Sequence, residues 1–161
     1  MTAERVAVFD TNVVVSGMLS PHGPPGRIIE WLRGGTIRAG PDDRVAAEYA
    51  EVLHRPELGL PPREVDLVLS AILAHALWAR IKPEHLAADV TDPDDAAFAE
   101  CARSLDCCLV TGNKRHYARA SAHGLMVLSP REFVEKVAGS AKVGRLATDQ
   151  TATEGKAERY L

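Results

Sequence analysis

The 161-residue sequence lacks several features that define specialised classes of protein. It contains no apolar run long enough to span a bilayer, which excludes a hydrophobic membrane helix. Its first residues lead directly into a short apolar segment, so we expect no signal peptide. The three cysteines follow no disulfide-framework spacing, and no Cys/His spacing is typical of a zinc site. We therefore expect a reduced, cytoplasmic protein without disulfides or zinc.

The chain also lacks an excess of positive charge and a glycine-rich phosphate loop. Its formal net charge is −3 at pH 7, which does not indicate a nucleic-acid binder, although binding depends on local patches rather than on total charge. The missing phosphate loop disfavours a small-molecule phosphatase on an α/β scaffold. Hydrophobic residues make up 46% and charged residues 25%, which is typical of one globular domain with a sizeable core.

Apolar runs alternate with helical periodicity along the chain. Strands are expected at 5–10, 36–39, 107–111 and 125–128, with a weaker candidate at 78–82. Helices are expected at 25–33, 42–54, 62–77, 92–105 and 130–137. This order predicts an α/β fold, a parallel β-sheet flanked by helices on both faces, over residues 1–138. Residues 139–161 are polar and carry almost no apolar stripe, which predicts a flexible C-terminal tail.

Oxygen-bearing side chains follow the ends of the predicted strands. Asp10 ends the first strand, Glu48 lies in the helix after the second, and Asn113 follows the third. Asp95 lies in the first turn of the helix that precedes that third strand. In a parallel sheet these positions share one edge, where open α/β sheets build their ligand sites. Three carboxylates and one amide there would suit Mg²⁺ or Mn²⁺.

Each member of this set also has a purely structural explanation. Asp10 and the acids of residues 92–95 could cap or begin helices. Glu48 could pair with Arg44 or Arg55 on its own helix, and the asparagine could be an ordinary turn residue. The prediction of a metal site therefore depends on the joint placement of the four residues.

Four segments resemble a known family. Residues 8–16 (Val-Phe-Asp-Thr-Asn-Val-Val-Val-Ser) are similar to the opening motif of PIN domains. Residues 92–98 resemble the third acidic motif of the PIN subfamily of toxin components from toxin–antitoxin systems. Residues 109–113 resemble the final motif, and 128–133 the closing segment of that subfamily. The four motifs occur in the family's order, and the resemblance covers roughly residues 5–137.

The resemblance implies a function. PIN domains are metal-dependent nucleases, and VapC-type toxins of this family cut RNA. Asp10, Glu48 and Asp95 would then be metal-binding acids, and Asn113 would stand where the family often has a fourth acid. Because an amide brings no charge, the resemblance implies that a second metal would be held less tightly than with a fourth acid. The implied protein is a Mg²⁺- or Mn²⁺-dependent endoribonuclease, with an antitoxin as its partner.

Further residues would support such a site. Candidates to orient the acids or bound waters by hydrogen bonds are Thr11, Asn12, Ser16, Asp92 and Thr111. Candidates to contact RNA phosphates are Lys114, Arg115, His116 and Arg119, although such a run is also typical of a solvated helix face. The neutral Asn113 keeps open a second interpretation, a PIN-like module that binds RNA or protein without cutting.

The two predicted helices at 42–54 and 62–77 carry a large apolar stripe. Its members are Val45, Tyr49, Val52, Leu53, Val65, Val68, Leu69, Ile72 and Leu73. This stripe favours a homodimer or an antitoxin-docking surface. The alternative is that the stripe faces the protein's own core.

Overall fold

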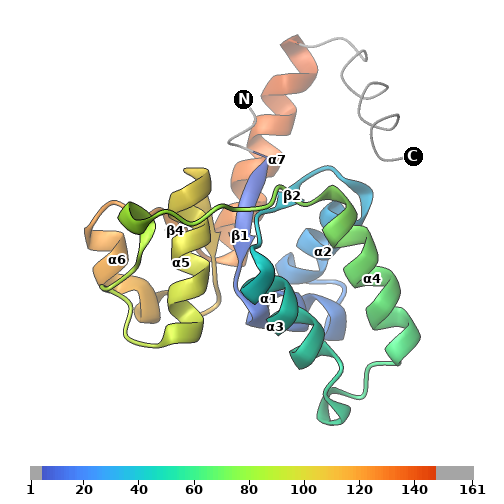
Figure 1. The fold of residues 1–161 in the computed structure, drawn as a ribbon. Coiled ribbons are helices and arrows are strands. Elements are labelled where there is room, and N and C mark those ends of the chain that lie inside the picture. Colours follow the sequence, from blue (N-terminus) through green and yellow to red (C-terminus); the bar gives the residue numbers. More distant parts are fainter. Residues whose placement is uncertain (1–4, 148–161) are drawn as a thin grey trace.

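The sheet is parallel and small. The computed structural model describes residues 5–147, and the side chains of 5–140 (Figure 1). Its four strands have the order β2-β1-β3-β4, and every pairing is parallel, as expected from the alternation of strands and helices. The strands are β1 (Val6–Phe9), β2 (Arg38–Ala39), β3 (Cys108–Val110) and β4 (Val127–Leu128).

Seven α-helices surround the sheet within the described residues. They are α1 (Thr11–Leu19), α2 (Pro24–Gly34), α3 (Asp43–Leu53), α4 (Pro62–His75), α5 (Pro93–Leu105), α6 (Ala118–Ala122) and α7 (Pro130–Ala147). Three short 3₁₀ helices lie between them, η1 (Pro56–Leu58), η2 (Pro83–His85) and η3 (Lys114–Tyr117). Figure 1 shows α5 and α6 on one side of β1 and α1 to α4 on the other. No helix in the described part is long and apolar enough to cross a bilayer.

Helices cover both faces of the sheet, as predicted. Phe9 of β1 meets Phe133 of α7 edge to face, with ring centroids 5.4 Å apart. The neighbouring residue Val8 points to the opposite face because side chains alternate along a strand. There, the space beside Gly40 is filled by Leu105 of α5 and by Val8. The sheet is therefore enclosed between α5 on one face and α7 on the other.

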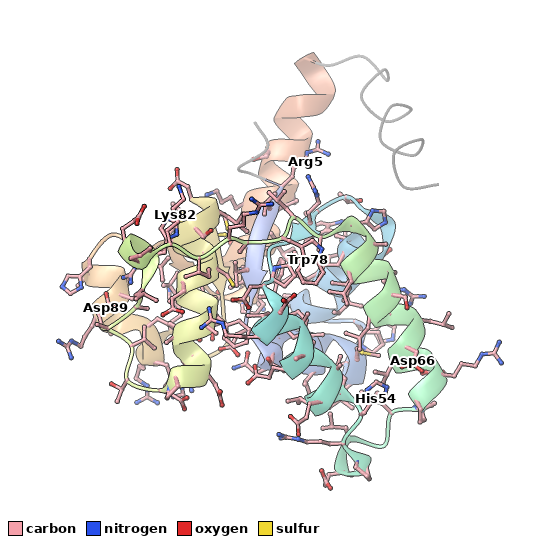
Figure 2. The ribbon with its side chains drawn as sticks, viewed as in Figure 1. Arg5, His54, Asp66, Trp78, Lys82 and Asp89 are labelled. Carbon is pink, nitrogen blue, oxygen red and sulfur yellow. The ribbon has the colours of Figure 1, made fainter. Side chains whose placement is uncertain are left out.

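Three local expectations differ from the structure. Helix α1 is absent from the helices expected from periodicity, although the capping explanation of Asp10 assumed a helix after it. Its three consecutive valines, 13–15, are more typical of strands. Segment 78–82 is not a strand. It belongs to the connection from α4 to α5, whose exposed Trp78 is labelled in Figure 2. The start of this connection lies along the outer edge of β2, where two backbone hydrogen bonds, Leu77 N to Ala39 O (2.9 Å) and Ala79 N to Pro41 O (2.8 Å), do not amount to a strand pairing.

The third difference concerns the last helix. Helix α7 continues to Ala147, well past the end expected at residue 137. It thus takes up the first part of the segment 139–161 for which a flexible tail was predicted. The remainder of that segment, 148–161, lies outside the described residues.

The apolar stripe of α3 and α4 faces the protein's own core. Its buried members are Val45, Tyr49, Leu53, Val65, Val68, Leu69 and Ile72. The large exposed apolar residue of this hairpin is Leu67, with 59% of its surface accessible. At the far end of the hairpin, His54 Nε2 lies 2.8 Å from Asp66 Oδ1 and ties the two helices together (Figure 2). The stripe is used internally, so it no longer supports the expectation of a dimer or an antitoxin-docking surface.

Candidate functional site

Asp10 lies at the carboxyl end of β1, and only 7% of its surface is exposed. It occupies the position before α1, yet its side chain makes no capping hydrogen bond, so the capping explanation is wrong. Instead its Oδ2 accepts hydrogen bonds from the hydroxyls of Thr111 (2.9 Å) and Tyr117 (3.4 Å). A buried carboxylate needs such partners because burial without them is costly.

Asp95 lies close to Asp10, as the sheet-edge prediction requires. The Tyr117 hydroxyl that contacts Asp10 is also 3.4 Å from Asp95 Oδ1. The two contacted carboxylate oxygens are therefore no more than twice that distance apart, within reach of one cation and its waters. The other oxygen of Asp95, Oδ2, lies 3.1 Å from Nδ1 of His116.

Glu48 joins the same group from α3. Its Oε2 accepts a hydrogen bond from the Thr11 hydroxyl. Burial raises the pKa of Glu48, and the negative charges of Asp94, Asp10 and Asp95 raise it further against the lowering effect of Thr11. Neither proposed helix partner binds it. Arg44 pairs with Asp42 and Glu100, and Arg55 with Glu51, so the ion-pair explanation of Glu48 is wrong.

The acid cluster, defined here as Asp10, Glu48 and Asp95, lacks a lysine or arginine partner among the residues whose side chains the structure describes. Within residues 5–140 no Lys or Arg forms an ion pair with any of the three. Burial raises the pKa of Asp95, and the charges of Asp10 and Asp92 add to the effect. Crowded carboxylates of this kind repel one another, and a cation would relieve the repulsion.

The cluster is not arranged as a finished coordination shell. Among the described residues, no three His, Cys, Asp or Glu side chains are placed so that they could hold a metal ion together. Two oxygens of the cluster nevertheless accept no hydrogen bond from any described residue, Asp10 Oδ1 and Glu48 Oε1. No polar side-chain atom in the described part is both buried and unpartnered, so these two oxygens are accessible to water or to a cation.

Asn113 lies at the rim of the cluster and contacts His116. Its Nδ2 is 2.9 Å from His116 Nε2, and its backbone N–H donates to Thr111 Oγ1 (3.0 Å). Its side-chain nitrogen therefore points to the histidine that contacts Asp95. The amide oxygen of Asn113 makes no hydrogen bond within the described residues.

The supporting residues divide into those inside the site and those beside it. Thr11 and Thr111 hold the acids, whereas Asn12 is exposed and accepts a hydrogen bond from Gly112 N (3.4 Å). Ser16 is exposed, and its side chain makes no hydrogen bond in the described part. Asp92 caps α5 by accepting from Asp94 N (2.9 Å), which confirms the capping explanation for that residue.

The four basic candidates differ in how they are engaged. Lys114 pairs with Glu132 at 2.9 Å, and His116 contacts Asp95. Arg115 is exposed and makes no hydrogen bond or ion pair within the described residues. Arg119 lies farther along the chain, at a shallow depression that it shares with Asp89 and His123.

Tyr117 is a site residue that the sequence patterns did not identify. It is fully buried, and burial next to Asp10 and Asp95 raises the pKa of its hydroxyl well above the usual value. Tyr49 is likewise buried, and its hydroxyl donates to the backbone oxygen of Phe9 at the end of β1. Neither contact leaves a signal in the sequence, because the partners are distant along the chain.

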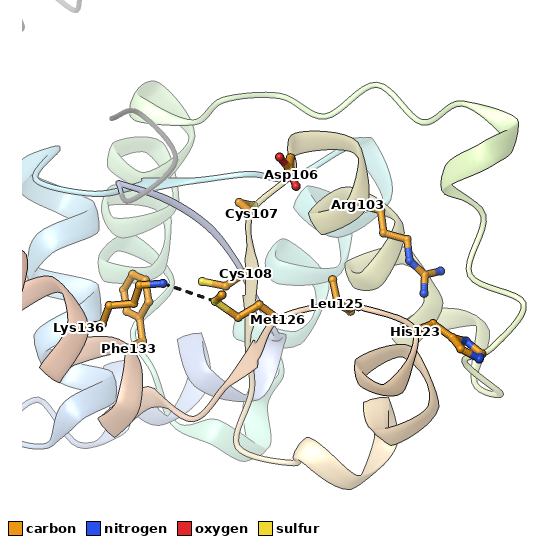
Figure 3. A pocket seen from close by; sticks show the side chains of 10 residues that line it. Arg103, Asp106, Cys107, Cys108, His123, Leu125, Met126, Phe133 and Lys136 are labelled. Carbon is orange, nitrogen blue, oxygen red and sulfur yellow. Dashed lines mark hydrogen bonds between the residues drawn. The ribbon is translucent and has the colours of Figure 1, made fainter.

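A separate cavity of about 400 Å³ lies away from the acid cluster (Figure 3). It adjoins the starts of β3 and β4, the edge of the sheet opposite to Asp10. Cys107, Cys108, Met126 and Lys136 line part of it, and Lys136 Nζ lies 3.5 Å from the Met126 sulfur. Burial raises the pKa of the Cys107 thiol to about 12, so this thiol is not a ready nucleophile.

Comparisons with known proteins agree with the motifs. The family model described as "PIN domain" matches residues 6–115. One curated relative is 25% identical over 138 residues, which cover 80% of this chain and 89% of the relative. It is the uncharacterized protein MJ1680 of Methanocaldococcus jannaschii.

Proposed function

Because the chain belongs to the PIN domain family, whose members are generally nucleases, we propose that it is a metal-dependent endoribonuclease that hydrolyses RNA phosphodiester bonds. The observation that carries the proposal is the acid cluster at the carboxyl edge of β1. Asp10 and Asp95 both contact the Tyr117 hydroxyl, and their negative charges help to raise the pKa of Glu48. Within the described residues no Lys or Arg forms an ion pair with any of the three acids. Carboxylates used only for folding are normally paired when buried.

The residues present fit Mg²⁺ or Mn²⁺. Their donors are carboxylate oxygens, which these hard cations prefer, and Asp10 Oδ1 and Glu48 Oε1 are free to bind. Asp10 and Asp95 would hold the ion, with Glu48 bound directly or through water, and the Asn113 oxygen would add a neutral ligand. When bound, such a cation lowers the pKa of a coordinated water and neutralises charge on the phosphodiester.

The chain's own residues would orient the reactants. Thr111 donates to Asp10 and Thr11 donates to Glu48, so these hydrogen bonds limit the rotation of the two carboxylates. Where Glu48 meets the cation through water, its Oε1 would be free to accept a proton from the attacking water, and the raised pKa of Glu48 makes it a better base. Exposed Arg115 and, farther away, Arg119 would contact phosphates along the RNA.

We further propose that the protein is the toxin component of a type II toxin–antitoxin system, acting in the cytoplasm as a homodimer with a cognate antitoxin. The support is the resemblance of residues 92–98 and 128–133 to the toxin subfamily. Induced expression in a bacterial host should arrest growth, and the Asp10→Asn variant at equal abundance should not. Equal growth with both proteins would contradict the toxin assignment.

One observation favours a second candidate function, a PIN-like module that binds RNA without cutting it. Asn113 replaces the fourth carboxylate, and its side-chain nitrogen is engaged by His116. A weak site of this kind would bind RNA and release it intact.

A cleavage assay separates the two functions. Purified protein is incubated with end-labelled single-stranded RNA, with Mn²⁺ or with EDTA, beside the Asp10→Asn variant. Fragments that appear only with Mn²⁺ and the parent protein support the nuclease. RNA that stays intact under all conditions, and that migrates more slowly on a native gel when the protein is present, supports the binding module.

A further inference from the structure

The Tyr117 hydroxyl lies between two carboxylates in a place that water cannot reach. Tyr117 has no accessible surface, and its hydroxyl is 3.4 Å from both Asp10 Oδ2 and Asp95 Oδ1. Its ring belongs to the core that surrounds the sheet, so packing fixes its position. The hydroxyl carries one proton, which it can donate to either acid or share between the two, and it has no other hydrogen-bond partner among the described residues.

The contacts of this hydroxyl determine which acid oxygens remain available. Asp10 Oδ2 is occupied by Tyr117 and Thr111, which leaves Oδ1 as the free oxygen. Asp95 is contacted on both sides, on Oδ1 by Tyr117 and on Oδ2 by the adjacent His116. Two consecutive residues thus restrain the carboxylate of Asp95.

A fixed phenol differs from a water molecule at the same place. A water could leave when a cation arrives, and the two carboxylates would then be free to rotate. The Tyr117 hydroxyl is covalently anchored to a buried ring, so it keeps both carboxylates aligned whether or not a cation is present. Pre-aligned ligands lose less conformational freedom on binding.

On the basis of the nuclease site proposed above, we propose that Tyr117 is a positioning residue whose hydroxyl aligns Asp10 and Asp95 for one divalent cation. It neither binds the cation nor touches RNA, and it acts only through the two acids. Outer partners of metal ligands typically contribute about 10–100-fold in metal affinity or activity.

The test is the variant Tyr117→Phe, which removes the hydroxyl and keeps the ring. The matched control is Tyr49→Phe, because Tyr49 is equally buried but donates to the backbone oxygen of Phe9. Mn²⁺ affinity is measured by calorimetry on the full chain, and kcat and KM are measured with labelled RNA. Thermal melts in EDTA confirm that each variant is folded at the assay temperature.

We expect Tyr117→Phe to weaken Mn²⁺ binding by about 10-fold or more and to lower kcat by a similar factor, with KM for RNA nearly unchanged. Tyr49→Phe should lose stability but keep Mn²⁺ affinity within about threefold of the parent. Unchanged or stronger Mn²⁺ binding by Tyr117→Phe would overturn the proposal. Equal losses of affinity in the two variants would also overturn it, because they would show a general packing effect.

The affinity measurement keeps this proposal separate from the proposed function. A parent protein that binds Mn²⁺ but cuts no RNA would contradict the nuclease, and the calorimetric comparison would still decide the role of Tyr117. A parent protein that binds no Mn²⁺ would contradict both.

Discussion

Two half-buried aspartates in this protein have opposite surroundings. Asp89, whose side chain is 10% exposed, receives two hydrogen bonds from Arg103 (2.6 and 3.0 Å) and one from His123 (2.9 Å). The Arg103 guanidinium holds the pKa of Asp89 well below its usual range. Asp95, 18% exposed, has no arginine or lysine partner among the described residues, its one basic neighbour being the His116 ring at 3.1 Å, and burial raises its pKa. The charge of Asp89 is balanced by Arg103, whereas Asp95 lies among other acids and should attract a cation.

This contrast separates acids that stabilise the structure from acids kept available for binding. Glu100 resembles Asp89, because it is buried, pairs with Arg44 (2.9 Å) and accepts from Ala87 N (3.0 Å). Glu48 resembles Asp95, because burial and neighbouring acids raise its pKa. Acids with a raised pKa and no Lys or Arg partner within residues 5–140 are of the kind that cluster at functional sites.

The largest expected effect is the loss of catalysis in Asp10→Asn. Replacing this acid removes the anion with the free Oδ1, so Mn²⁺-dependent RNA cleavage should fall by roughly 100-fold or more. The fold should persist, because the substitution lowers repulsion within the acid cluster. Cleavage kinetics and a thermal melt of the same sample check the prediction. Full activity, or inactivity explained by unfolding, would remove Asp10 from the site.

The converse variant, Asp89→Asn, should be less stable than the parent and should cleave RNA equally well. It leaves Arg103 and His123 without their anion, which should cost about 1–3 kcal/mol of unfolding free energy. Denaturant melts measure that loss, and cleavage by the folded fraction should equal that of the parent. A variant as stable as the parent would show that the Asp89 pairs contribute little.

Asn113→Asp should strengthen the acid cluster. A carboxylate at the rim adds attraction for a cation, so the variant should gain more thermal stability from Mn²⁺ and cut RNA several-fold faster. The new acid would also face His116 at the place where the amide nitrogen now lies. Melts with and without Mn²⁺, run beside the cleavage assay, test both parts. Equal metal-induced shifts in parent and variant would exclude this residue from the metal site.

The smallest expected effect is a rise of a few degrees in the melting temperature of Glu48→Gln in EDTA at neutral pH. Because the folded-state pKa of Glu48 is raised, its ionised form opposes folding above that pKa. This penalty disappears as the pH falls below the pKa of Glu48 in the unfolded chain, so the melting temperatures of parent and variant should converge at about pH 4. The contribution of Asp89 to stability depends on pH in the opposite way. Because its folded-state pKa is lowered, the ionised Asp89 stabilises the fold at neutral pH, and this stabilisation is lost as the pH falls. A variant no more stable than the parent at neutral pH would contradict this repulsion.

The sequence was sufficient to predict the parallel sheet and the meeting of Asp10 with Asp95, because strand ends converge at one edge of such a sheet. It was insufficient for contacts that depend on packing. Tyr117 reaches two acids that precede it by many residues, and no local pattern marks that encounter. Helix α1 was left out of the expected helices for a related reason, since its valines favour strands by propensity, and tertiary packing, in which Val13 and Val14 are buried, overrides that preference.

The most direct test of the central claim is anomalous scattering from a crystal of the protein soaked in Mn²⁺. The acid cluster should bind the ion, so the account predicts an anomalous peak bonded to Asp10 and adjacent to Glu48 and Asp95. No peak should appear beside Asp89, whose charge is already neutralised. An acid cluster without a peak at a concentration that saturates binding in solution would contradict the account.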